Sequence, residues 1–204
     1  MKKRNFFILV SSIFLVLACI SFFGLREHFF PSSYRSLVMN NALQEKIDPL
    51  LLAALIYRES GFKQAAVSSA GAIGLMQIRP TTIKELARLR KITKDSYNRE
   101  DLFSAEKNIR LGTLYMNVLL ERLFSIEERK IKIDSWYAGD PTRVILASYN
   151  AGPTVILQQC LDKCSTKEEY ERILQQKRPT TIKYANDILM VQKVLWITNK
   201  VLPL

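Results

Sequence analysis

The sequence predicts an all-α protein in which an N-terminal membrane anchor precedes a single helical domain. Strand signals are weak, because no segment alternates apolar and polar residues and no Asn-Gly or Asp-Gly turn joins two β-branched runs. Helix start and stop signals are frequent instead. The 204 residues, 48% hydrophobic and 24% charged, are too few for two full domains and too apolar for a disordered protein.

The first element is a run of 20 uncharged residues from Phe6 to Leu25, which is long enough to cross a bilayer as a helix. The basic residues at positions 2–4 precede it. Such a cationic flank favours the cytoplasmic side, so we expect everything after Arg26 to lie outside the cytoplasm, in the periplasm or extracytoplasmic space of a bacterial envelope. A cleaved signal peptide is the alternative.

These signals divide the chain into three parts. Residues 1–25 are assigned to the anchor, residues 26–44 to a juxtamembrane linker and residues 45–204 to the folded domain. Cys19 leaves a further alternative open, because Val16–Cys19 is similar to a bacterial lipobox, in which the cysteine is lipidated and the preceding residues are removed. Either the apolar helix or the lipid would attach the body to a membrane.

The folded domain begins with Asp48-Pro49, an N-cap followed by proline at the first helical position. The next segment, Leu50–Tyr57, is apolar nearly all round, as expected for a helix at the centre of a domain. Two capping boxes, Thr82–Glu85 and Thr166–Glu169, predict the starts of two further helices.

The rest of the domain is also expected to be helical. Apolar residues at helical spacing predict a helix over Asn108–Leu123. Asp140-Pro141 starts another helix, Gly152-Pro153 ends it, and the last helix is expected over Ile182–Asn199. Two segments are expected to be loops: residues 92–103 and 125–140.

The net charge of +11 suits a polyanionic partner such as nucleic acid, anionic lipid or an acidic wall polymer. Because the anchor places the body outside the cytoplasm, we expect no nucleic-acid partner. One basic cluster is then either a solvated face or a contact for anionic wall polymers: Lys84, Arg88, Arg90, Lys91 and Lys94.

Glu59 stands at the end of the buried helix, directly before Ser60 and Gly61. A carboxyl at the end of an apolar helix is partly desolvated, which raises its pKa and keeps it protonated near neutral pH, as a general acid requires. The alternative is a surface glutamate that pairs with Arg58 or Lys63.

Two later segments have the composition of a binding site. Ser68–Gln77 contains two glycines, which let the backbone turn and lie close to a ligand, and Gln77 offers a donor and an acceptor for a sugar amide or hydroxyl. Each segment alone also fits a structural role, as a turn between core helices or, for Ala147–Pro153, as a helix C-terminus.

Together these segments resemble the lytic transglycosylases with the goose-type lysozyme-like fold. The resemblance covers residues 45–195, where Tyr184 stands at the position of a family tyrosine, and implies a single lysozyme-like (SLT-type) helical domain. It rests on four motifs in the family's order: ESGF (Glu59–Phe62), GAIGLMQI (Gly71–Ile78), NIRLGTLY (Asn108–Tyr115) and SYNAGP (Ser148–Pro153).

The resemblance implies cleavage of the β-1,4 bond between N-acetylmuramic acid and N-acetylglucosamine in peptidoglycan strands. Glu59 would protonate the glycosidic oxygen and then act as base while the muramoyl 6-hydroxyl attacks C1, leaving a 1,6-anhydromuramoyl end. The substrate's own acetamido oxygen would stabilise the oxocarbenium-like centre. No residue cluster has metal-ligand spacing, no cofactor is expected, and any partner in envelope assembly is unknown.

The resemblance also assigns substrate contacts near Glu59. Ser60 and Gln77 would hold the acetamido and hydroxyl groups of the sugars. Met76 would form part of the apolar wall of the cleft.

A second group of residues comes from the later motifs. Tyr149 would position the acetamido group or Glu59, and Asn150 would order the loop against the site. Tyr184 would hydrogen-bond Glu59 or the sugar, and Tyr115 would line the cleft.

Two rival functions remain open. A lysozyme-type muramidase is a hydrolase that places a second carboxylate about 5 Å from the acid, or further away if it inverts the sugar. Its candidates here, Asp95, Asp101 and Asp140, lie in predicted loops or caps, outside the matched motifs. The other rival is a non-catalytic peptidoglycan-binding assembly protein, which would have no need of an acid at Glu59.

Cys160 and Cys164 are four residues apart, so a helix would place them on one face. An oxidising compartment favours a bridge between them. The sequence leaves open whether they form a disulfide or stay as two free thiols.

Overall fold

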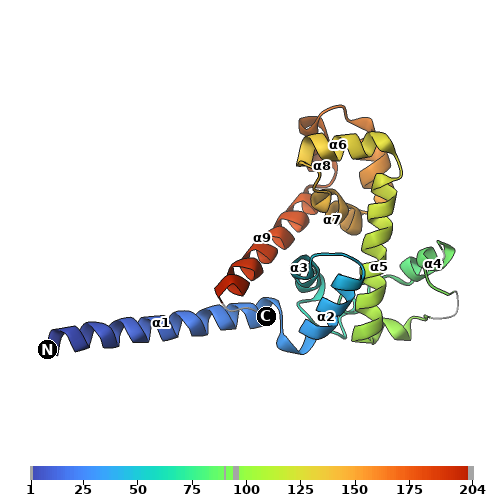
Figure 1. Cartoon of the computed structure of the whole chain (residues 1–204). Coiled ribbons are helices and arrows are strands. Elements are labelled where there is room, and N and C mark those ends of the chain that lie inside the picture. The colour runs from blue at the N-terminus through green and yellow to red at the C-terminus, as the bar shows by residue number, and fades with distance from the viewer. Residues whose placement is uncertain (1, 90, 94–96, 202–204) are drawn as a thin grey trace.

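The computed structural model describes residues 2–89, 91–93 and 97–201, with side chains from Ser11 onward (Figure 1). Every regular element in these ranges is helical, and β pairing is limited to isolated bridges, so the all-α prediction is confirmed. The α-helices are α1 (Lys2–Phe29), α2 (Ser32–Gln44), α3 (Pro49–Ser60), α4 (Pro80–Arg88), α5 (Ala105–Phe124), α6 (Glu127–Tyr137), α7 (Thr142–Ala151), α8 (Lys167–Lys177) and α9 (Pro179–Val201). Three short helical segments complete the described part: the 3-10 helices η1 (Glu100–Phe103) and η3 (Leu161–Lys163), and the π-helix η2 (Thr154–Cys160).

Helix α3 is the predicted apolar helix, and it packs against α1, α2 and α9. Asp48 caps its first turn by accepting a 2.8 Å hydrogen bond from the Leu50 amide. All six residues from Leu51 to Ile56 are buried in the core. The helix ends at Gly61, whose φ of 58° only glycine adopts without strain. Glu59 is therefore held in the last turn of a core element.

Several other predicted helix boundaries are confirmed. Helices α5 and α9 cover the predicted segments, and α7 lies between Asp140-Pro141 and Gly152. Thr166 caps α8 by accepting a 3.2 Å hydrogen bond from the Glu169 amide. The first capping box is wrong, because α4 begins at Pro80, two residues before Thr82. Proline carries a backbone angle that is already helical and lacks only an amide hydrogen that the first turn does not use.

Two segments that we expected to be a juxtamembrane linker and a loop contain helices. The expected linker at residues 26–44 contains the end of α1 and all of α2, which packs against α3 and α5 and buries Val38 and Ala42. The expected loop at residues 125–140 contains α6. Neither sequence has a clear apolar stripe, and α6 even buries Arg129 and Lys132, so contacts with distant elements decide both helices.

The expected loop at residues 92–103 is partly regular. Its last four residues form the 3-10 turn η1, whose Leu102 is buried. Residues 94–96 of this loop lie outside the described residues.

Helix α1 extends away from the domain, and α9 runs from the far end of the domain back to α1 (Figure 1). Within α1, Ser11–Phe29 has a mean hydropathy of 1.5 and is long enough to cross a membrane. Few of its side chains are buried by the domain. An apolar helix of this length with so little protein around it has the character of a membrane-spanning segment or a signal sequence.

Candidate active site

Glu59 and Tyr184 meet where the end of α3 packs against α9. The Tyr184 hydroxyl donates a hydrogen bond to Glu59 Oε1, and the Tyr184 side chain is buried. Burial raises the pKa of the Glu59 carboxyl above its ordinary value, although the Tyr184 hydrogen bond and the Arg58 charge act in the opposite direction. A carboxyl in this state can hold a proton that it later donates.

Arg58 does not neutralise the neighbouring carboxyl by pairing with it. Its Nε lies 3.3 Å from Asp187 Oδ2 on α9, and its guanidinium lies 5.2 Å from the centre of the Tyr184 ring. Asp187 also pairs with Lys183 at 2.7 Å. The Arg58 guanidinium thus contacts both Asp187 and the Tyr184 ring on α9. These contacts reinforce the packing of α3 against α9 that places the Tyr184 hydroxyl on Glu59.

Tyr149 of α7 stands beside this pair, and Tyr115 of α5 packs against Tyr149. Their rings meet edge to face with centroids 5.7 Å apart, and the Tyr149 hydroxyl donates a 2.8 Å hydrogen bond to the Met76 carbonyl. Burial and the nearby Glu59 charge raise the pKa of Tyr149 well above its ordinary value, and burial raises the pKa of Tyr115 to about 12. Both phenols therefore remain protonated near neutral pH.

The glycine-rich loop at residues 71–78 is held by Asn108 from α5. This buried side chain donates from Nδ2 to the carbonyls of Ile73 (2.9 Å) and Leu102 (2.7 Å). Its Oδ1 accepts a 2.8 Å hydrogen bond from the Met76 amide. Asn108 belongs to the NIRLGTLY motif, and its role in holding the loop was not predicted from the sequence. The sequence feature that could have indicated this role was the amide side chain of Asn108 on the apolar side of a predicted helix.

Gly74 allows the Asn108 side chain to lie against the backbone of the loop. Its φ is 80°, and a Cβ added there would lie 2.7 Å from Asn108 Cγ and closer still to the Leu102 carbonyl. Only glycine has both the backbone freedom and the space.

Ser60 and Gln77 both donate hydrogen bonds to backbone carbonyls within the loop and before it. Ser60 Oγ donates a 2.8 Å hydrogen bond to the Leu75 carbonyl. Gln77 Nε2 donates to the carbonyls of Gly74 (2.9 Å) and Ala66 (3.2 Å). In this structure both residues shape the loop beside Glu59.

The position of Met76 differs from the expected one in the wall of the cleft. Its side chain is fully buried against Gly112 of α5, where an added Cβ would lie 2.9 Å from Met76 Cβ. Glycine on α5 opens the space that the thioether fills, so Met76 supports the loop from behind and offers the site its backbone carbonyl only.

Asn150, at the end of α7, is exposed and accepts a 2.9 Å hydrogen bond from Thr181 Oγ1 on α9. The contact joins the helix that carries Tyr149 to the helix that carries Tyr184. Asn150 thereby orders two elements of the site.

The carboxylates considered for a hydrolase have other partners. Asp101 accepts a 2.8 Å hydrogen bond from the Asn98 amide, and Asp140 accepts one of 2.9 Å from the Thr142 amide. Asp95 lies outside the described residues. The charged group that acts on the Glu59 pKa is Arg58, whose charge lowers it.

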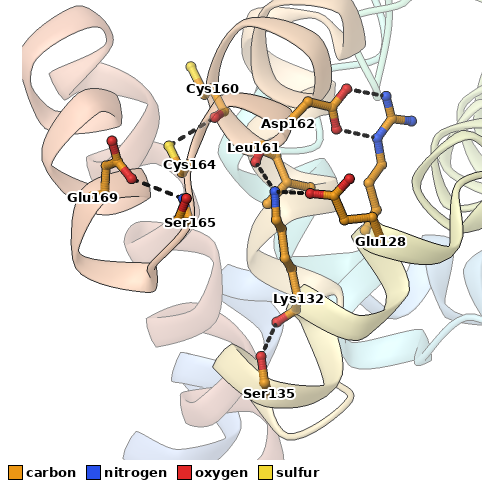
Figure 2. A network of polar contacts seen from close by, with 10 residues as sticks. Glu128, Lys132, Ser135, Cys160, Leu161, Asp162, Cys164, Ser165 and Glu169 are labelled. Atoms are coloured by element: carbon orange, nitrogen blue, oxygen red, sulfur yellow. Dashed lines mark hydrogen bonds and ion pairs between the residues drawn. The ribbon is translucent and has the colours of Figure 1, made fainter.

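The cysteines lie away from these residues. Cys160 and Cys164 are buried and unbridged, and the Cys164 thiol donates a 2.9 Å hydrogen bond to the Cys160 carbonyl (Figure 2). Burial raises the pKa of both thiols. Cys19 is exposed on α1. In the described ranges no group of three His, Cys, Asp or Glu side chains is placed to hold a metal ion.

Curated relatives share parts of this sequence. The endo-type membrane-bound lytic murein transglycosylase A of Klebsiella pneumoniae is 37% identical over 73 residues, which cover 36% of each protein. The membrane-bound lytic murein transglycosylase C of Actinobacillus pleuropneumoniae is 34% identical over 126 residues, which cover 61% of this chain and 32% of the relative. The chain thus spans about a third of the length of these relatives.

Solved structures share its fold. An inactive mutant of the lytic transglycosylase Slt from Pseudomonas aeruginosa superposes with a TM-score of 0.61 at 26% identity, over 87% of this chain and 25% of that one. The 70 kDa soluble lytic transglycosylase of Escherichia coli gives a TM-score of 0.66 at 21% identity, over 88% of this chain and 26% of that one. Residues 36–171 match the family described as "Transglycosylase SLT domain", and this chain belongs to that family.

Proposed function

We propose that the protein is a peptidoglycan lytic transglycosylase, which cleaves the β-1,4 bond between N-acetylmuramic acid and N-acetylglucosamine without consuming water. The observation that carries the proposal is the desolvated Glu59 carboxyl with the Tyr184 hydroxyl on its Oε1. Membership of the family and relatives named as lytic murein transglycosylases support the substrate class.

In the first step, Glu59 donates its proton to the bridging oxygen. The bond between that oxygen and C1 of the muramoyl residue breaks, and the N-acetylglucosamine side leaves with a free 4-hydroxyl. A carboxyl whose pKa is raised by burial suits this step, because proton transfer is efficient when the pKa of the acid is near the working pH.

In the second step, the 6-hydroxyl oxygen of the same muramoyl residue bonds to C1, and its proton passes to the Glu59 carboxylate. The product has a 1,6-anhydro ring and the enzyme regains its starting protonation state. Between the steps, the 2-acetamido oxygen of the substrate stabilises the positive charge near C1, as in substrate-assisted glycosidases.

The protein groups around Glu59 then have separate roles. The Tyr184 hydroxyl stabilises the carboxylate after proton donation. Tyr115, Tyr149, Ser60 and Gln77 are proposed to surround the sugars. Their contacts with the loop and with each other make this surface rigid before substrate arrives.

The proposal includes a location. Helix α1 is long and apolar enough to anchor the protein in a membrane, and the relatives cited above are named as membrane-bound. The basic flank at residues 2–4 favours the cytoplasmic side, which would leave the catalytic domain in the extracytoplasmic part of the bacterial envelope, where peptidoglycan lies.

The test is digestion of purified peptidoglycan by the full chain in detergent, with the products identified by mass. Glu59→Gln removes the acid and keeps the shape, and Glu168→Gln is the matched control because Glu168 is an exposed glutamate of α8. We expect anhydro-ended muropeptides from the parent and the control, and a loss of about 10²–10⁴-fold in Glu59→Gln.

Each other result has a definite meaning. Products heavier by one water would identify a lysozyme-type hydrolase. Binding of peptidoglycan by the parent without any products would identify a non-catalytic wall-binding protein. Equal activity of Glu59→Gln and the parent would remove Glu59 from the mechanism.

A further inference from the structure

The C-terminal half of α9 carries an apolar stripe that the domain leaves exposed. Met190, Ile197 and Val201 are 63%, 40% and 49% exposed, and Val194 between them is partly buried. Their spacings of four, three and four residues place these four side chains on one face of the helix. We call these four residues the α9 stripe.

Aromatic and basic side chains flank the α9 stripe. Trp196 is 55% exposed, and Lys200 Nζ lies 5.3 Å from the centre of its ring. Lys193 is exposed about two helical turns before Lys200, and no acidic residue occurs between Ile188 and Val201. Apolar residues beside tryptophan and lysine are typical of helices that lie in the interface of a bilayer, where lysine reaches the headgroups with its charged end.

The position of α9 points to the same partner. Helix α9 packs beside α1, and Figure 1 shows its C-terminal end reaching the part of α1 that leads into the domain. A bilayer that surrounds the exposed apolar segment Ser11–Phe29 of α1 would therefore meet the end of α9 as well.

We propose that the α9 stripe, together with Trp196 and the two lysines, docks into the interface of the bilayer that α1 crosses. The inference rests on the proposed membrane attachment through α1, and it adds a second contact with the lipid. Two lysines in a stretch of α9 that contains no acidic residue of its own favour a surface with anionic headgroups over a second copy of this basic chain.

This contact would set the distance between the site and the membrane. Tyr184 and Ile197 belong to the same helix and are 13 residues apart, which corresponds to about 20 Å along the axis. Because Tyr184 also binds Glu59, docking of the α9 stripe would hold the carboxyl at a constant height above the lipid.

The two tryptophans of the chain allow a direct test. In Trp136→Phe the only tryptophan is Trp196, and in Trp196→Phe it is Trp136, which lies on α6 (Glu127–Tyr137), away from α1 (Figure 1). The full chain is reconstituted in vesicles of phosphatidylcholine and phosphatidylglycerol, with and without brominated acyl chains. We expect brominated lipid to quench Trp196 and lipid to shift its emission to the blue, with Trp136 unaffected.

A double variant tests the α9 stripe itself. Ile197→Glu with Val201→Glu, made in the Trp136→Phe background, should abolish the quenching of Trp196. Ile131→Glu in the same background is the matched control, because Ile131 is an exposed apolar residue of α6. Both variants should still float with the vesicles, since α1 is unchanged.

The outcomes separate the two proposals. Flotation with unquenched Trp196 would overturn the docking of α9 and leave the α1 anchor intact. Failure of the parent to float would overturn both membrane contacts, whereas the muropeptide assay in detergent would still decide the catalytic proposal. A blue-shifted Trp196 that brominated lipid does not quench, together with cross-linked dimers, would assign the stripe to a second copy and overturn the lipid contact.

Discussion

The Tyr184 hydroxyl donates a hydrogen bond to Glu59 Oε1, although the two residues are 125 positions apart. The contact has two opposing consequences for the carboxyl. Burial between α3 and α9 disfavours the carboxylate, while the hydrogen bond favours it, and burial has the larger effect on the pKa. The same helix contact therefore both desolvates the acid and stabilises its conjugate base.

We expect Tyr184→Phe to move the pH dependence of activity. Without the hydrogen bond to its charged form, Glu59 should have a still higher pKa. A general acid must be protonated, so the alkaline limb of the kcat/KM profile should shift to higher pH, while kcat falls about tenfold, or ~1.4 kcal/mol. Rates of muropeptide release across pH would measure both effects.

Tyr34→Phe is the control for this change, because Tyr34 belongs to α2 and its ring packs against Phe62. Its profile should coincide with that of the parent. An alkaline limb that stays in place in Tyr184→Phe would contradict a direct effect of Tyr184 on Glu59.

We expect Glu59→Gln to stabilise the fold at neutral pH. The pKa of Glu59 is raised in the folded state, so the folded protein binds this proton more tightly than the unfolded chain does. The stabilisation of the fold by this bound proton is complete below the ordinary glutamate pKa of 4.5. It is lost as the pH rises through the pKa of Glu59 in the folded state. Glutamine has no such loss, so the free energy of unfolding at pH 7 should increase by about 1 kcal/mol.

Urea unfolding at pH 7 and at pH values below the ordinary pKa would measure this difference. The gain in Glu59→Gln should be present at pH 7 and shrink on acidification. Glu168→Gln should match the parent throughout. A Glu59→Gln protein that is less stable than the parent at pH 7 would show that the carboxylate is not disfavoured by burial.

We expect Gly74→Ala to be far more harmful than Gly71→Ala. Both glycines have positive φ, 80° and 77°, so both substitutions strain the backbone, at a cost of about 1 kcal/mol. Only at Gly74 would the new methyl collide with Asn108 and the Leu102 carbonyl, whereas nothing lies within 4 Å at Gly71. The Gly74 variant should lose about 3 kcal/mol or more in urea unfolding. Equal losses in the two variants would contradict the close packing of Asn108.

A fourth prediction concerns the ion pair that joins α6 to the turn η3. Arg129 is 5% exposed and donates two 2.7 Å hydrogen bonds to Asp162, the carboxylate at the top of Figure 2. Asp162→Ala leaves this cation buried without its partner, so we expect a loss of about 3 kcal/mol in the free energy of unfolding. A double-mutant cycle with Arg129→Met should give a coupling above about 1 kcal/mol.

The exposed pair Lys130–Glu127, with a separation of 4.0 Å on the same helix, is the control for this cycle. Its coupling should be no more than about 0.5 kcal/mol, because water screens both charges. Equal coupling energies for the two pairs would show that burial adds nothing to the bond between Arg129 and Asp162.

Local features of the chain determined most of the fold. The Asp48-Pro49 cap, the apolar run that follows it and the glycine that ends α3 act within one or two turns, so their meaning can be read from neighbouring residues. The same holds for the membrane-length segment of α1 and for the position of Glu59 at the end of a buried helix. Helical periodicity and capping depend on short sequence separations, and the sequence displays them directly.

The tertiary structure alone decided which side chains meet. Tyr184 reaches Glu59 over 125 residues, Asn108 holds a loop that lies 32 to 35 residues earlier, and Met76 turns from the expected cleft wall into the space beside Gly112. Helices α2 and α6 exist because distant elements cover them, not because of a stripe in their own sequence. Burial, and with it the raised pKa of Glu59, is a property of the packed helices, since the solvent around a carboxyl is removed only by neighbours that the chain brings together in three dimensions.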